Sequence, residues 1–71
     1  MNIERQIKQH MRATLRAGEC IDRHTGIADC TKLAEETAHA LGHSEWLDDD
    51  QHIVWDIAIE VAEDLGFGDH A

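Results

Sequence analysis

Residues 50–67, DQHIVWDIAIEVAEDLGF, decide the fold, because no other stretch of the chain holds enough apolar residues to anchor a core by itself. At about 100° per residue, several of these side chains fall on one face of a helix. That face consists of Ile53, Val54, Ile57, Ala58, Val61 and Leu65. We therefore predict a helix over residues 50–65. Gly66 is suited to end it, and Phe67 can fold back onto the last turn.

The same helix carries more apolar surface than one core face needs. Trp55, Ile59 and Ala62 widen the apolar face and leave only a narrow acidic strip. A helix of this kind must be covered on two sides, either by the rest of a bundle or by a second copy of the chain. Trp55, Ile59 and Ala62 are therefore a candidate dimer interface.

Two further helices precede this one. The first is predicted over residues 2–17, with Asn2 as its N-cap, and the second over residues 29–41, with Asp29 as its N-cap. The apolar stripe of the first consists of Ile3, Ile7, Met11 and Leu15. The buried side of the second consists of Cys30, Leu33, Ala34, Thr37 and Leu41. The fold class is thus all-α: a small three-helix bundle, possibly dimeric.

The chain of 71 residues is expected to form a single helical domain over residues 1–71 with a frayed tail at 68–71. Proline and tyrosine are absent and there is one phenylalanine, which disfavours a sandwich or barrel. No apolar run is long enough for a membrane span or a signal peptide. We expect a cytoplasmic protein with reduced cysteines and no membrane partner.

Charge is distributed unevenly along the chain. The formal net charge is −9. Up to Arg23 there are five basic and three acidic residues, whereas the remainder holds Lys32 against twelve acids. This polarity predicts that the helix over 2–17 lies against the acidic part of its own chain or of a second subunit. The negative balance argues against direct nucleic-acid binding.

Three consecutive carboxylates, Asp48, Asp49 and Asp50, precede the helix over 50–65. Asp48 followed by Gln51 resembles a capping box, but capping explains only one or two of the three. Together with the acidic residues Asp56, Glu60 and Glu63 of that helix, they form a candidate anionic surface. Trp46 is a candidate apolar anchor beside it. The candidate partner-binding residues are Asp48, Asp49, Asp50, Asp56, Glu60, Glu63 and Trp46.

A metal site is a minor alternative. The possible ligands are Cys20, His24, Cys30, His39 and His43. Two histidines four residues apart on a helix can share zinc, but no Cys-x-x-Cys pair is present and the cysteines and histidines fall on different sides. We therefore predict no metal and no cofactor, and keep a Cys/His zinc-binding domain only as a third hypothesis.

The sequence disfavours an enzyme and a helix-turn-helix DNA-binding protein. Three short helices rarely enclose an active site, and no nucleophile or phosphate-loop motif is present, so we expect no enzyme. Residues 33–42, LAEETAHALG, superficially resemble the first helix of a helix-turn-helix motif, but the following segment is acidic where basic or amide residues are required. The ten residues 19–28 form a long connection, interpreted as a turn that caps the next helix, with a functional loop as the alternative.

From the sequence we predict a small acidic protein-binding module that occludes a basic, nucleic-acid-binding surface of a partner protein. Small size and acidity are common among phage and plasmid proteins that block nucleic-acid enzymes, a similarity of type only. The alternative is a homodimeric structural or regulatory protein without nucleic-acid mimicry.

Overall fold

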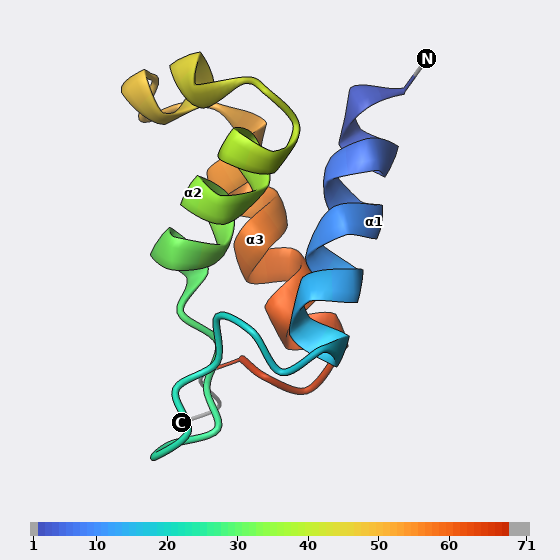
Figure 1. Cartoon of the computed structure of the whole chain (residues 1–71), viewed down its shortest axis with the longest axis vertical. Helices are drawn as coiled ribbons and strands as arrows, with labels where there is room; N and C mark the ends of the chain where they lie inside the picture. Colours follow the sequence, from blue (N-terminus) through green and yellow to red (C-terminus); the bar gives the residue numbers. More distant parts are fainter. Residues whose placement is uncertain (1, 69–71) are drawn as a thin grey trace.

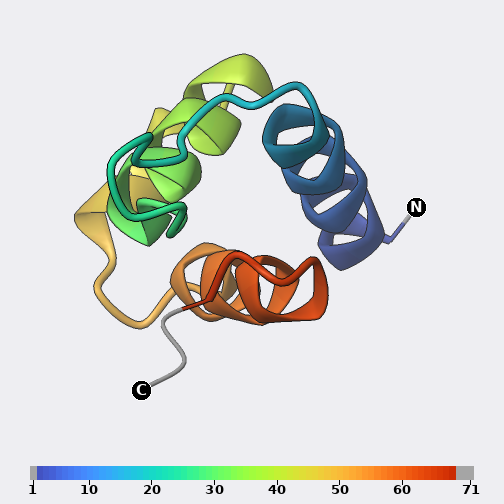
Figure 2. The ribbon, with the colours of Figure 1, turned by 90° about the horizontal axis from the view of Figure 1, so that it is seen from below.

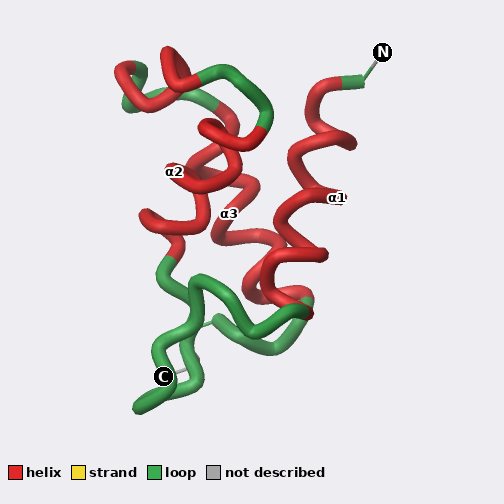
Figure 3. The backbone as a smooth tube through the Cα atoms, in the orientation of Figure 1, coloured by secondary structure: helices red, strands yellow, loops and turns green. Residues whose placement is uncertain are grey.

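The computed structural model describes residues 2–68 and shows three α-helices packed as a bundle. The elements are α1 (Ile3–Arg16), α2 (Cys30–Ala40), a 3-10 helix η1 (Ser44–Asp48) and α3 (Ile53–Asp64). Helices α1 and α3 run in the same direction and α2 runs against both (Figure 1). The tube in Figure 3 shows no strand along the described residues. The prediction of a three-helix, all-α fold is confirmed.

The core lies between the three helices, which surround it when the bundle is seen end-on (Figure 2). Its buried side chains are Ile7, Met11, Leu15, Ala28, Leu33, Ala34, Val54, Ile57, Ala58, Val61 and Ala62. Two predicted members are absent, because Ile3 is 39% exposed and Ile53 is 42% exposed. Ile53 is the first residue of α3, where the helix has only begun to meet its neighbours.

The starts of α1 and α2 match the prediction. The side chain of Asn2 accepts a hydrogen bond from the Arg5 N–H, and that of Asp29 accepts one from the Lys32 N–H. The end of α3 was also predicted: Gly66 adopts φ +82°, and the Phe67 N–H donates to the Ala62 carbonyl at 2.8 Å. This pattern satisfies carbonyls that the helix leaves open.

Helix α3 begins three residues later than predicted, at Ile53 instead of position 50. His52 is its N-cap, and the ring Nδ1 accepts the Val54 N–H at 3.0 Å. Upstream, the Asp49 carboxylate accepts the Gln51 N–H at 2.9 Å and closes a separate turn. The predicted capping box of Asp48 and Gln51 is therefore wrong. Residues 48–51 belong to the end of η1 and to the turn after it, and not to the first turn of α3.

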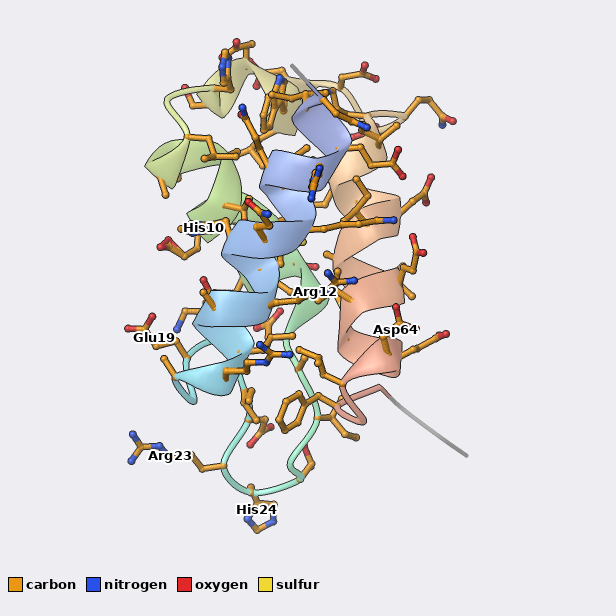
Figure 4. All side chains as sticks on the ribbon, turned by 90° about the vertical axis from the view of Figure 1, so that its right-hand side faces the viewer. His10, Arg12, Glu19, Arg23, His24 and Asp64 are labelled. Atoms are coloured by element: carbon orange, nitrogen blue, oxygen red, sulfur yellow. The ribbon has the colours of Figure 1, made fainter. Side chains whose placement is uncertain are left out.

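The connection between α1 and α2 is fastened to the end of α3. Ile21 and Ala28 form an isolated antiparallel bridge, and the Ala28 N–H donates to the Phe67 carbonyl at 2.8 Å. Ile21 packs against the core. Arg23 and His24 lie at the tip of the loop, away from the helices (Figure 4). The predicted frayed tail falls largely outside the described residues, which end at position 68.

Charge pairs join α1 to both other helices. Lys8 Nζ is 3.6 Å from Glu60 Oε1 on α3, and His10 Nε2 is 3.7 Å from Glu36 Oε1 on α2. The second distance exceeds a hydrogen bond, so the buried Nε2 of His10 has no hydrogen-bond partner and gains an ion pair only when protonated. Figure 4 shows His10 and Arg12 on opposite edges of α1. The predicted contact between the basic first helix and the acidic part of its own chain is confirmed.

None of the helices within residues 2–68 combines the length and apolarity that spanning a bilayer requires.

Candidate protein-binding surface

Most of the predicted carboxylates gather where η1 meets α3. Asp48 is the last residue of η1, Asp49 and Asp50 occupy the following turn, and Asp56 lies in the first turn of α3. All four residues are exposed, and so is Glu45 in η1. We call Glu45, Asp48, Asp49, Asp50 and Asp56 the acidic end. Among the described residues, no Lys or Arg nitrogen lies within 4.0 Å of a carboxylate of the acidic end.

Two predicted carboxylates lie farther along α3. Glu60 and Glu63 are exposed and follow Asp56 at spacings of four and seven residues, so the three share one side of the helix over about 10 Å. Glu60 differs from the others because Lys8 lies beside it. The middle of the predicted strip is therefore partly neutralised, whereas the four aspartates of the acidic end have no Lys or Arg partner within 4.0 Å.

The turn that carries Asp49 is held by several hydrogen bonds. The Asp49 carbonyl accepts the His52 N–H at 3.1 Å and the Trp55 indole N–H at 2.9 Å. Its carboxylate accepts the Gln51 N–H. These bonds fix the backbone between η1 and α3, so the neighbouring side chains of Asp48 and Asp50 project from an ordered turn.

Trp46 lies between two histidine rings. Its ring centroid is 4.6 Å from that of His43, with 9° between the planes, and 4.8 Å from that of His52, with 17° between the planes. We call these three side chains the ring stack. The imidazoles stack on the indole, and Trp46 is partly buried, so the predicted apolar anchor offers a partner only part of its surface.

His43 also reaches the acidic end. Its Nδ1 is 2.9 Å from Glu45 Oε1, and this hydrogen bond from His43 lowers the pKa of the Glu45 carboxyl. His43 and His52 were not predicted at this surface. A histidine is not among the usual N-caps, and the spacing of His43, Trp46 and His52 matches no helical period, so the pattern carried no signal.

The predicted dimer interface is only partly exposed. Ile59 is 50% exposed, and Trp55 is partly buried and bonded to Asp49. Ala62 is 1% exposed and belongs to the chain's own core, so placing it in an interface was wrong. Its small side chain faces the rest of the bundle, whereas the helical wheel alone placed it at the border of the core.

The cysteines and histidines proposed as metal ligands do not form a cluster. Cys30 Sγ lies 3.9 Å from the carbonyls of Ala28 and Ala58, within the bundle. Burial raises the pKa of both Cys20 and Cys30 thiols, which are free. Within residues 2–68, no three His, Cys, Asp or Glu side chains are placed to hold a metal ion.

A surface depression with a volume of about 430 Å³ lies at the other end of the bundle. Its lining residues are Gly18, Glu19, Cys20, Ile21, Arg23, Lys32 and Glu36. Two acidic and two basic residues line it together with the Cys20 thiol, whose pKa is raised by burial. Because the acidic and basic residues of the lining balance, the depression favours neither an anionic nor a cationic ligand.

Comparisons with models of protein families, with curated proteins and with solved structures found no match to this chain.

Proposed function

We propose that this protein binds a partner protein through the acidic end and thereby occupies a basic surface that the partner uses for nucleic acid. The observation that carries the proposal is the exposed, unpaired set of carboxylates around Asp48, Asp49 and Asp50, in contrast to the paired Glu60. Such a set attracts a basic surface over about 8–10 Å in physiological salt and raises the rate of association.

Three further features support this mechanism. The turn of Asp49 is fastened by hydrogen bonds, so little ordering is needed when a partner docks. The net charge of −9 on 71 residues adds a long-range attraction for basic partners. Glu63 extends the negative surface along α3, beyond the pair of Lys8 and Glu60.

The test is capture of partners from a lysate of the native host after nuclease treatment. The test variant replaces Asp48, Asp50 and Asp56 with Lys. The control replaces Glu19, Glu35 and Asp64 with Lys, which changes the net charge equally at exposed sites away from the acidic end. We expect the wild type and the control to retain the same nucleic-acid-binding protein, and the test variant to lose it with its helical content intact. Equal retention by both variants rejects the proposal.

The second candidate is a homodimer that uses the outer face of α3. The half-exposed side chain of Ile59 favours it, and the partly buried Trp55 precedes Ile59 by one helical turn. In that case the carboxylates only keep the protein soluble. Ile59→Glu separates the two candidates, because it introduces a charge into such an interface and leaves the acidic end unchanged.

A further inference from the structure

The ring stack brings two titratable groups onto the faces of one indole. His43 precedes η1 and His52 caps α3, so the stack joins the two elements that carry the acidic end. With centroids 4.6 and 4.8 Å from Trp46, a positive charge on either imidazole lies over the negative face of the indole. Histidine is the side chain whose charge ordinarily changes between pH 5 and 8.

The hydrogen bonds of the two histidines depend differently on protonation. His52 Nδ1 accepts the Val54 N–H, so this nitrogen carries no proton in the folded structure. Protonation there turns the acceptor into a donor, removes the α3 cap and places a positive charge at a helix N-terminus. His43 Nδ1 keeps its contact with Glu45 in either state, and protonation converts the contact into an ion pair.

The elements that meet at the stack carry other charged groups. Glu45 and Asp48 come from η1, and Asp49 and Asp50 from the turn beside His52; α2 brings His39 in its last turn. Asp56 lies in the first turn of α3. The ordinary pKa of a carboxyl group lies at about 4, well below that of an imidazole. Two protons on the ring stack therefore reduce the formal charge of this region from about −5 to about −3, counting the five carboxylates of the acidic end.

We propose that the ring stack makes the acidic end sensitive to pH. Protonation of His43 and His52 neutralises part of its charge and removes the hydrogen bond by which His52 caps α3. A basic partner then binds more weakly at the lower pH. The effect on the partner rests on the proposed function, whereas the titration of the stack does not.

The first test follows the fluorescence of Trp46. The chain has two tryptophans, so Trp55→Phe leaves Trp46 as the only indole. A protonated imidazole in contact with an indole quenches its emission, and we expect the emission to fall between pH 8 and 5. Adding His43→Gln and His52→Asn removes both titrating rings, while Asn preserves the cap. The fall should then disappear.

A second readout avoids the Trp55 substitution. In the wild type, the NMR signal of the Trp46 indole N–H should shift over the same pH range as the ring protons of His43 and His52. A Trp46 emission and N–H signal that stay constant from pH 8 to 5 overturn the inference.

The final test measures binding of deca-lysine, a basic probe, at pH 7.5 and 5.5. For the wild type, Kd should rise roughly three- to tenfold at pH 5.5, because two charges near the site are neutralised. For His43→Gln with His52→Asn, the ratio of the two Kd values should be close to one. Equal ratios in both proteins overturn the pH effect. No binding at pH 7.5 rejects the proposed function instead, even where Trp46 fluorescence still titrates.

Discussion

Lys8 on α1 places its Nζ 3.6 Å from Oε1 of Glu60 on α3, and this pair divides the acidic surface into two parts. The same Nζ is 3.5 Å from Glu4, so one ammonium group serves two carboxylates. On one side of the pair lies the acidic end with its unpaired charge, and on the other side lies Glu63. Partner binding is therefore expected to depend mainly on the acidic end.

Removing Glu60 tests this division. The Glu60 side chain is 54% exposed, so Glu60→Gln should change the free energy of unfolding by less than about 1 kcal/mol. It should also weaken retention of the partner less than Asp50→Asn, which removes an unpaired charge. Urea denaturation and the capture assay give the two numbers. A larger loss of binding from Glu60→Gln would place the contact in the middle of α3.

The burial of Leu33 predicts a large loss in the free energy of unfolding when this side chain is shortened. Leu33 is fully buried between the helices, so Leu33→Ala should cost about 2–5 kcal/mol, a large part of the stability of so small a domain. Ile59→Ala is the matched control, because half of that side chain is exposed, and its cost should stay below about 1.5 kcal/mol. Thermal unfolding followed by circular dichroism measures both. Similar costs for the two variants would contradict the burial of Leu33 and the exposure of Ile59.

Ile59→Glu separates the two functional candidates. If the acidic end binds a partner, this variant should retain the partner as well as the wild type does. Sedimentation velocity supplies the second measurement, because a homodimer built on Ile59 should dissociate into monomers on this substitution. A variant that is monomeric and has lost its partner, beside a dimeric wild type, supports the homodimer.

The thiols should react slowly. Burial is the main cause that raises the pKa of Cys20, with Glu36 adding to it, and burial followed by Asp29 raises the pKa of Cys30. A raised pKa reduces the thiolate fraction at pH 8, and the thiolate is the reacting form. Modification by a disulfide reagent at pH 8 should be slower than that of a small free thiol and should accelerate in urea. Equal rates with and without urea contradict this prediction.

The same shifts affect stability at high pH. The folded state disfavours the thiolates, so the contribution of the protonated thiols is complete below the ordinary pKa of 9.0 and is lost as the pH rises through the raised values. The free energy of unfolding should therefore decline above about pH 9, and replacing both cysteines with Ala should reduce that decline.

The sequence was sufficient for the helices because their signals are local. Asn2 and Asp29 lie directly before apolar stripes of helical period, and Gly66 directly follows one. These residues act through hydrogen bonds to their own neighbours in the chain, so the pattern identifies them without knowledge of the tertiary structure.

The start of α3 and the ring stack could not be found in this way. The spacing of Asp48 and Gln51 is typical of a capping box, but Asp48 is the last residue of η1. His52 caps α3 instead. The stack depends on how η1 and the turn after it fold, which brings together three rings that no regular spacing relates. Ala62 was misplaced for a related reason, since the wheel gives an angle and not the position of neighbouring helices.

The most direct measurement of the central claim is the salt dependence of affinity for the captured partner, compared between the wild type and the two triple Lys variants. We predict that the wild type and the control with Glu19, Glu35 and Asp64 replaced lose affinity in parallel as salt rises from about 50 to 300 mM, as expected for attraction between exposed charges. The variant with Asp48, Asp50 and Asp56 replaced should bind at least about tenfold more weakly at low salt and respond little to added salt. Equal affinities and equal salt dependence in all three proteins would contradict binding through the acidic end.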